Sequence, residues 1–588
     1  MREPRRLRNS KSRVFATASS GVVFLLLSCG ALFAQQPPGA LPTSPETAIE
    51  EAATGQIAGT VISAKTGEIL KGVEVMTRGM VPGGRGPSPP VIRETIAGID
   101  GRFVLTDLPP AEYDLIASKA GYGGQYAFNS ASRIRLAADE QRTDVVLRLQ
   151  PSAVVTGRVL DAYGEPLPEA QVQALTRRAL PGRATRWMTV QGARTNDLGE
   201  YRLHGLDAGK YVIAAQAPRA ASPRGVAYAE FAPSYYPGAV SLDQASPIRL
   251  TYGAEMNGVD FQLDRSPETT VRGIVIDGST GEACTCSLRF GDDEVMGRFD
   301  FGTQTTKEGV FVVHGLQPGT RSIMANLDRG GAPRFHSEQI QVPESGDLEV
   351  RIAIGGSYAV SGEFVLEDPP EQKPAEQSQS GGAQQQNATP DPQRPIMFAL
   401  ESLGPFPFPG GRGTVPPQGG SFEIGEVQSG EYRIRVYGMP AGGYLRLVTL
   451  DGRELSAPRI TVPRDGPLTG LKLYAAFDGA SIQGMVKPAA GEETRDVSGG
   501  QFVMAVPDGD LNAYAEQSMT RLEPGGGFTF QTLAPGSYIL FVANSPTIDI
   551  SDPDIRRALK PYSKQVSLAK KEQARVELTA APESVELW

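Results

Sequence analysis

The sequence predicts an all-β protein in which about five β-sandwich domains follow one another along the chain. Three observations favour this fold class. The 588 residues far exceed the length that forms a single core. The 68 Gly and 47 Pro suit many short strands joined by frequent turns. One pattern of glycine, aromatic, leucine, glycine and tyrosine occurs five times without gaps.

Each copy of this pattern begins with a glycine that is followed two residues later by an aromatic side chain. Leu or Val stands seven residues after the glycine, and Tyr stands twelve residues after it, with Arg321 in the third copy. The two alternating runs and the Pro- or Gly-rich stretch between them predict a β-hairpin. We expect the Tyr ring to lie in the core with its hydroxyl bonded near the turn. The copies start at Gly101, Gly199, Gly309, Gly420 and Gly526.

A second shared element precedes each predicted hairpin and is called here the opening strand. It is a short β-run with a glycine at its third position. The glycines of successive opening strands lie 89 to 122 residues apart, which is the size of one sandwich domain and not of one solenoid coil. The opening strands are predicted at residues 57–61, 155–159, 271–275, 360–364 and 482–486.

Together these motifs resemble the carboxypeptidase regulatory-like domain, a prealbumin-like or transthyretin-like β-sandwich. The B-type repeat of collagen-binding adhesins is a near relative. The resemblance covers most of residues 55–580 and is most specific in the first two copies. It implies Ig-like modules of seven strands that serve as accessory or stalk domains in exported proteins, not as catalytic units. The Lys–Asn isopeptide bonds of those adhesins are not predicted, because the opening strands carry no Lys at a matching place.

The repeats and the composition between them predict the domain boundaries. Residues 369–395 are rich in Gln, Ser, Pro and Gly and lack large apolar residues, so we expect a disordered insertion there. The predicted division is a signal peptide at 1–34, a spacer at 35–54, sandwiches at 55–150, 151–264, 265–355, 356–475 and 476–581, and a tail at 582–588.

The first residues indicate export. A basic segment precedes an apolar run that begins at residue 21, and cleavage is expected after Ala34. An alternative signal, Leu26-Leu27-Ser28-Cys29, resembles the bacterial lipobox and would place a lipid on Cys29. Either signal places the chain in the periplasm, at the cell surface or outside the cell, with no membrane span in the mature chain.

Charge and cysteine usage exclude several function classes. Residues 1–34 carry six basic residues and one acidic residue, so their removal would change the net charge from −9 to −14. Nucleic-acid binding then has no electrostatic basis. Only Cys284 and Cys286 remain beyond the signal, and their spacing favours two thiols over a strained disulfide.

The sequence shows no catalytic constellation, and we expect neither enzyme activity nor a cofactor or metal. The histidines are His204, His314 and His336, and none stands in H-x-x-E or H-E-x-x-H. G-x-S-x-G and Walker motifs are also missing. The acidic-Gly dipeptides before the aromatic strands are interpreted as turns and not as calcium ligands.

These observations predict a cell-envelope adhesion, scaffold or stalk protein whose partner is an extracellular or envelope protein or a polysaccharide. Carbohydrate binding through aromatic loop residues is the alternative. The candidate ligand platform is Trp187 with Tyr235 and Tyr236, for which packing inside the second sandwich or over a domain junction is the competing interpretation.

Overall fold

A computed structural model describes most of the chain after the predicted spacer. The predicted signal peptide with Cys29, nearly all of the spacer and of the insertion at 369–395, and most of the tail lie outside the described residues. The structure describes residues 54–80, 90–123, 130–178, 185–218, 224–228, 230–292, 295–296, 301–327, 334–368, 395–404, 409–491, 501–508, 517–523, 525–543, 548, 550, 552–582 and 585.

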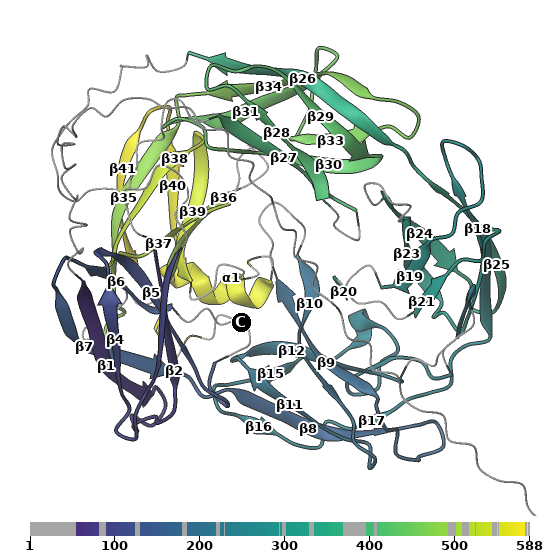
Figure 1. The fold of residues 1–588 in the computed structure, drawn as a ribbon, viewed down its shortest axis with the longest axis horizontal. Coiled ribbons are helices and arrows are strands. Elements are labelled where there is room, and N and C mark those ends of the chain that lie inside the picture. The colour runs from purple at the N-terminus through teal and green to yellow at the C-terminus, as the bar shows by residue number, and fades with distance from the viewer. Residues whose placement is uncertain are drawn as a thin grey trace, which may run out of the picture. The chain divides into compact units, whose positions relative to one another are not determined.

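The described residues form β-sandwiches (Figure 1), so the all-β prediction is confirmed. The single α-helix in the described part of the chain is α1 (Pro553–Leu559). Asp552 caps this helix, because its carboxylate accepts hydrogen bonds from the backbone N–H groups of Asp554 and Ile555. Among the described residues no helix has both the length and the apolar character needed to cross a bilayer.

The first sandwich shows the arrangement that recurs along the chain. One sheet has the order β4-β1-β7 and the other has the order β3-β2-β5-β6. The strands are β1 (Gly55–Ser63), β2 (Glu74–Met80), β3 (Val91–Ile96), β4 (Arg102–Leu108), β5 (Ala111–Ser118), β6 (Ser130–Leu136) and β7 (Gln141–Leu149).

The second sandwich is built from a β11-β8-β16 sheet, to which β17 adds, and a β14-β12-β9-β10-β20 sheet, to which β15 adds. Its strands are β8 (Ala153–Leu160), β9 (Gln171–Arg178), β10 (Arg186–Arg194), β11 (Glu200–Leu206), β12 (Gly209–Gln216), β14 (Ser234–Tyr235), β15 (Ile248–Leu250), β16 (Glu255–Met256), β17 (Phe261–Gln262) and β20 (Val295–Met296).

The third sandwich pairs a β13-β22-β18-β25 sheet with a β21-β19-β23-β24 sheet. Its strands are β13 (Val226–Tyr228), β18 (Thr269–Asp277), β19 (Ser287–Gly291), β21 (Phe301–Gln304), β22 (Val310–His314), β23 (Gly319–Leu327), β24 (Arg334–Val342) and β25 (Gly346–Ile354).

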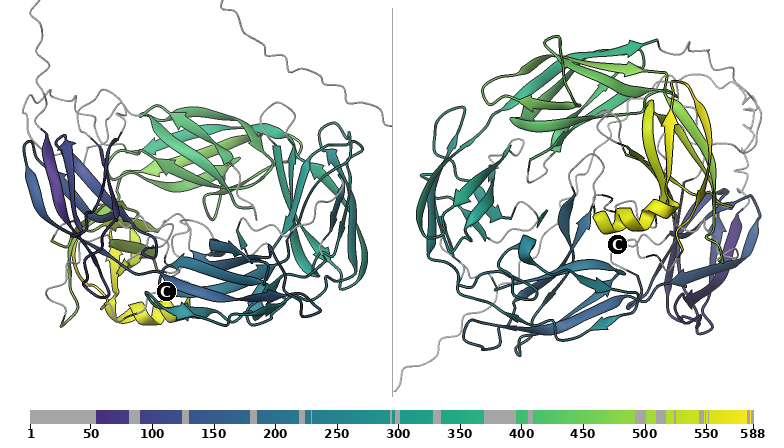
Figure 2. Two further views of the ribbon diagram at one scale, coloured as in Figure 1. Left: turned by 60° about the horizontal axis from the view of Figure 1, so that its bottom comes forward. Right: turned by 180° about the vertical axis from the view of Figure 1, so that it is seen from behind.

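The last two sandwiches repeat the two-sheet plan, and the two layers of strands can be followed in Figure 2. The fourth contains β26 (Ser357–Glu367), β27 (Ile396–Ser402), β28 (Pro409–Val415), β29 (Gly420–Gln428), β30 (Gly430–Tyr437), β31 (Tyr444–Leu450), β32 (Arg453–Glu454), β33 (Arg459–Val462) and β34 (Leu468–Ala476). The fifth contains β35 (Ala480–Lys487), β36 (Phe502–Pro507), β37 (Ser518–Arg521), β38 (Gly527–Leu533), β39 (Gly536–Ala543), β40 (Lys564–Leu568) and β41 (Gln573–Thr579).

The opening strand is central in its sheet in every sandwich. It pairs antiparallel with the strand that carries the pattern's aromatic residue, and parallel with one or two strands near the end of the same repeat. Buried apolar residues from both sheets meet between the layers, and five large clusters draw mainly on residues 57–149, 153–263, 271–354, 360–475 and 480–580. Burial of these side chains is the main stabilising contribution to each sandwich.

The predicted hairpin is wrong. The aromatic strand β4 pairs with β1, whereas the tyrosine strand β5 pairs with β2 and β6 in the opposite sheet. The same division holds in the other four copies, so the turn between the two strands crosses from one layer to the other. Alternation and a turn are shared by hairpins and cross-layer connections, and the sequence pattern alone does not tell them apart.

The pattern's tyrosine fixes this crossing turn. The hydroxyl of Tyr432 donates a hydrogen bond of 2.9 Å to the carbonyl oxygen of Gln428, four residues earlier. Tyr113, Tyr211 and Tyr538 make the same bond to the carbonyl four residues before them. Arg321 replaces the tyrosine in the third copy, and its Nε donates to the carbonyl of Gln317 at 3.0 Å. The predicted placement of the tyrosine hydroxyl is thus confirmed, and the tyrosine-corner bond is kept where the residue differs.

The glycine of the opening strand lies between two neighbouring strands of the same sheet, and both approach it closely. In the fourth sandwich Gly362 is directly opposite Phe422 in the antiparallel register and opposite Leu471 in the parallel one. A Cβ atom at Gly362 would overlap the carbonyl oxygen of Leu471 and the ring of Phe422. The equivalent glycines of the other copies likewise have no room for a Cβ, so steric crowding and not backbone angle explains the glycine. They are Gly59, Gly157, Gly273 and Gly484.

We expect Gly362→Ala to lower the free energy of unfolding of the fourth sandwich by about 2 kcal/mol, because the added methyl group must displace strand β34 or the Phe422 ring. The full chain is unfolded in denaturant and subjected to pulse proteolysis. The yield of peptides from residues 356–475 then reports the unfolding of the fourth sandwich. Gly425→Ala is the matched control, since its Cβ would meet nothing within 4 Å. Equal stability of the two variants would contradict the steric account.

A pH dependence follows from the buried tyrosines. Burial raises the pKa of Tyr538 from 10.0 to about 12. Above pH 10 the unfolded chain loses this proton while the folded chain keeps it, so the stability of the fifth sandwich should fall as the pH rises from 10 to 12. Tyr538→Phe should remove this part of the dependence, as measured by unfolding of the full chain at pH 9 and pH 11. An unchanged slope in the variant would contradict the prediction.

Candidate functional site

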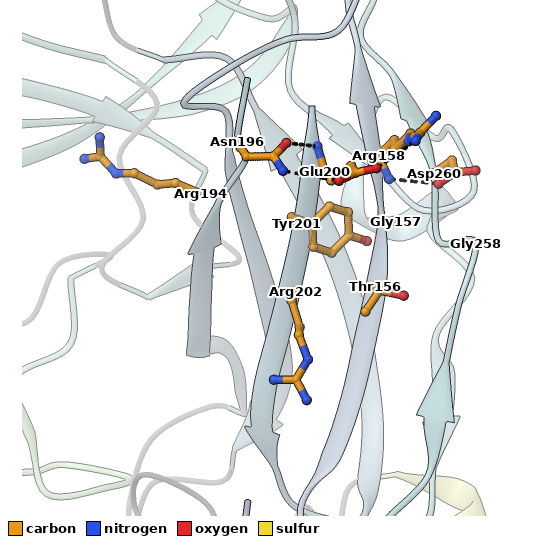
Figure 3. Close-up of a pocket in the computed structure, with 10 residues that line it drawn as sticks. All are labelled: Thr156, Gly157, Arg158, Arg194, Asn196, Glu200, Tyr201, Arg202, Gly258 and Asp260. Carbon is orange, nitrogen blue, oxygen red and sulfur yellow. Dashed lines mark hydrogen bonds and ion pairs between the residues drawn. The ribbon is translucent and has the colours of Figure 1, made fainter. Parts of the chain in front are cut away.

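A cavity of about 790 Å³ opens on the second sandwich, over the sheet that contains β8 and β11 (Figure 3). The antiparallel register places Glu200 opposite Arg158, Tyr201 opposite Gly157 and Arg202 opposite Thr156. The alternation of each strand sends Arg158, Glu200, Arg202 and Thr156 to the outer face and Tyr201 to the core. The lining residues are Thr156, Gly157, Arg158, Arg194, Asn196, Glu200, Tyr201, Arg202, Gly258 and Asp260.

One end of the cavity is a charged hydrogen-bonded group. Arg158 Nη2 donates to Glu200 Oε1 at 2.7 Å, and Asn196 Nδ2 donates to Glu200 Oε2 at 3.2 Å. The hydrogen bond from Arg158 lowers the pKa of the Glu200 carboxyl most, and the hydrogen bond from Asn196 lowers it further. Asn196 Oδ1 in turn accepts from the backbone N–H of Glu200 at 2.8 Å. Glu200 is therefore an ionised, oriented carboxylate and not a proton donor at neutral pH.

The segment between β16 and β17 runs beside β8, and side-chain hydrogen bonds as well as backbone bonds hold it there. Asp260 Oδ1 accepts a hydrogen bond of 2.8 Å from the backbone N–H of Arg158, and Thr156 Oγ1 donates to Asn257 Oδ1 at 2.6 Å. The Tyr201 hydroxyl donates to the carbonyl oxygen of Val259 at 2.6 Å. Desolvation of the Tyr201 ring raises its pKa. These bonds fix the rim and floor of the cavity.

The arrangement suits polar contact more than covalent chemistry. Arg194 pairs with Glu169 at 2.8 Å and lies apart from the Arg158–Glu200 group in Figure 3. Arg158, Glu200 and Asp260 are engaged with each other or with backbone, and their bonds make a fixed pattern of charge at this end of the cavity. In the described ranges no three His, Cys, Asp or Glu side chains converge as metal ligands would. The sequence did not predict this cavity, because Gly157 and Tyr201 belong to the repeated fold pattern and the charged lining residues form no catalytic or metal-binding motif.

The predicted aromatic platform is divided between two packing environments. Tyr235 is 4% exposed and belongs to a cluster with Leu175 and Val212, against which Trp187 packs while half-buried. Tyr236 faces the main core instead, where its ring meets Phe261 edge-on at 6.2 Å. Trp187 is also paired in register with Val295, from the range predicted for the third sandwich. The ring of Tyr235 is thus not available to stack on a sugar, and these positions fit the packing interpretation.

The histidines, cysteines and acidic-Gly turns considered in the sequence analysis have packing or hydrogen-bonding roles where the structure describes them. His314 Nδ1 lies 3.3 Å from Thr270 Oγ1, and His336 Nε2 lies 3.1 Å from Glu338 Oε2. Cys284 and Cys286 are buried thiols, and burial raises the pKa of Cys286 to about 11, which makes it a poor nucleophile. In the first acidic-Gly turn the carboxylate is bonded to the turn itself, because Asp100 Oδ1 accepts a hydrogen bond of 3.2 Å from the backbone N–H of Arg102.

The strands that hold the cavity carry a recognisable family pattern. Residues 154–236 match the model of the carboxypeptidase regulatory-like domain. The predicted resemblance is confirmed for this segment. The regulatory-like segment contains the Arg158–Glu200 group, Trp187 and both tyrosines of the predicted platform.

Three pilins are among the solved structures to which the chain shows similarity. They are a Streptococcal ancillary pilin (11% identity, 51% of this chain and 99% of that chain, TM-score 0.16), the minor pilin GBS52 of Streptococcus agalactiae (12%, 36% and 97%, TM-score 0.22) and the major pilin subunit BcpA of Bacillus cereus (9%, 51% and 99%, TM-score 0.13). The low TM-scores show that these chains do not superpose globally on this one. No curated protein matches the chain.

We expect Tyr235→Ala to lower the stability of the second sandwich by about 3 kcal/mol, because it removes a buried ring from the cluster with Leu175 and Val212. Tyr163→Ala is the control, since Tyr163 is largely exposed and should change stability by about 0.5 kcal/mol. Thermal unfolding with hydrogen exchange of β12 and β14 measures both. A Tyr235→Ala variant as stable as the control would contradict the packing assignment.

Proposed function

We propose that the chain is an exported, non-catalytic scaffold or stalk that holds adhesive turns at a distance from the cell envelope. The observation that carries the proposal is the shortness of the connections between successive sandwiches. Three residues separate β7 from β8, six separate β17 from β18, two separate β25 from β26, and three separate β34 from β35. Links this short restrict the motion of neighbouring modules far more than a flexible Gly/Ser linker would.

Hydrogen bonds further restrict these connections, as at the first and the last of them. The backbone N–H of Ser152 donates to Gly121 at 2.8 Å, and Gly123 N–H donates to Gln150 at 2.9 Å. At the last connection Gly479 N–H donates to Gly442 at 3.0 Å, and Asp478 pairs with Lys570 at 2.8 Å. The connecting residues are therefore part of the packed structure, as a spacer that bears load requires.

Turns at equivalent positions of the first two sandwiches supply candidate contact surfaces. Ile99 precedes Gly101 in the first copy and is 92% exposed, and Leu198 precedes Gly199 in the second copy and is 54% exposed. Large apolar side chains at turn tips gain free energy when a partner covers them. We infer that the partner is an extracellular or envelope protein that binds these tips.

We expect the double variant Ile99→Ser, Leu198→Ser to bind its envelope partner more weakly, because two apolar contacts of roughly 0.7 kcal/mol each are lost. In cells, the fraction of full-length tagged chain that is cross-linked to an envelope protein should fall by about tenfold. Val240→Ser is the control, since Val240 is similarly exposed but lies outside these turns. Unchanged cross-linking in the double variant would refute the adhesive tips. Binding of the folded chain to a glycan array would favour the carbohydrate alternative.

A further inference from the structure

The second and third sandwiches each contain a strand that belongs to the chain segment of the other. Strand β13 lies in the range predicted for the second sandwich, yet it pairs in parallel with β22 of the third, with Val226 opposite Val312 and Ala227 opposite Val313. Gly225 N–H donates to the carbonyl of Gln304 at 2.6 Å, and Val312 N–H donates to the carbonyl of Gly225 at 2.7 Å. Strand β13, from the range predicted for the second sandwich, therefore completes the β22 edge of a sheet in the third sandwich.

The exchange runs in the other direction as well. Strand β20 follows β19 of the third sandwich and pairs in parallel with β10 of the second, with Val295 opposite Trp187. Val295 is 1% exposed and packs in the cluster that contains Leu175, Val212 and Tyr235. This strand covers the apolar outer side of the second sandwich, which would otherwise face water.

Each exchanged strand contributes to the core that it enters. Ala227 is buried in the main core cluster of the third sandwich, with Val313 and Phe311. Side-chain bonds reinforce the same contact, because Arg224 Nη2 donates to Gln304 Oε1 at 3.0 Å and Thr303 Oγ1 donates to Val226 O at 3.0 Å. Strand addition of this kind joins backbone hydrogen bonds with side-chain burial.

We propose that the second and third sandwiches exchange edge strands and unfold as one cooperative unit. Unfolding the third sandwich withdraws β20 from the second, and unfolding the second withdraws β13 from the third. The exchange also covers two sheet edges that could otherwise pair with another chain.

Trp187 reports the exchange, because it lies against Val295 and the only other tryptophan is Trp588. In the full chain carrying Trp588→Phe, Phe311→Ala weakens the third core. We expect the red shift of Trp187 emission to move to lower denaturant concentration, together with loss of exchange protection in β22. Phe422→Ala, at the same repeat position of the fourth sandwich, is the matched control and should leave the Trp187 transition in place. A Trp187 transition that Phe311→Ala does not move would overturn the proposal.

A second measurement covers the case in which Phe311→Ala fails to fold. Ala227→Asp places a charge in the third core from a residue of the second sandwich's range, and hydrogen exchange should show loss of protection in β22 and β18. Val240→Asp is the control, because its side chain is 53% exposed. Protection lost only in β9 and β12 after Ala227→Asp, with β22 unchanged, would also overturn the exchange.

Discussion

The contact between the opening-strand glycine and the two strands beside it is the constraint on which each sandwich depends. At Gly362 the Phe422 ring and the Leu471 carbonyl occupy the space that a Cβ would need. The opening strand can therefore sit between an antiparallel and a parallel neighbour at close range, while the aromatic ring fills the core above the missing side chain. Because the same glycine recurs five times, the same arrangement of the opening strand between an antiparallel and a parallel neighbour recurs in five sheets.

The crossing turn depends on that sheet. Once the aromatic strand is fixed beside the opening strand, the chain must pass to the other layer, and the tyrosine hydroxyl ties the turn to the carbonyl four residues back. Arg321 shows that the bond matters more than the ring, since its Nε reaches the equivalent carbonyl of Gln317. The glycine and tyrosine positions thus serve folding, and any recognition depends on the turns and outer faces between them.

The short connections and the exchanged strands restrict the motion of neighbouring sandwiches relative to one another. Connections of two to six residues leave little freedom between neighbours. Strands β13 and β20 further tie the second sandwich to the third, so that Trp187 and Tyr235 lie in a joint between modules. Aromatic residues that resemble a sugar platform in the sequence are in this account the packing of that joint.

The sequence by itself determined the all-β class, the repeat, the core position of the tyrosine and the family resemblance. These properties depend on alternation, turn residues and spacing, which are local. It could not show that the aromatic and tyrosine strands belong to opposite sheets, because a hairpin and a cross-layer turn have the same local pattern. Only the tertiary structure decided that Tyr235 is buried, that Arg158, Asn196 and Glu200 gather at one cavity, and that Val295 completes a neighbouring sheet. Each of these contacts joins residues that are distant in the chain or lie in neighbouring strands, and their pairing is fixed by strand register within a sheet or by side-chain packing.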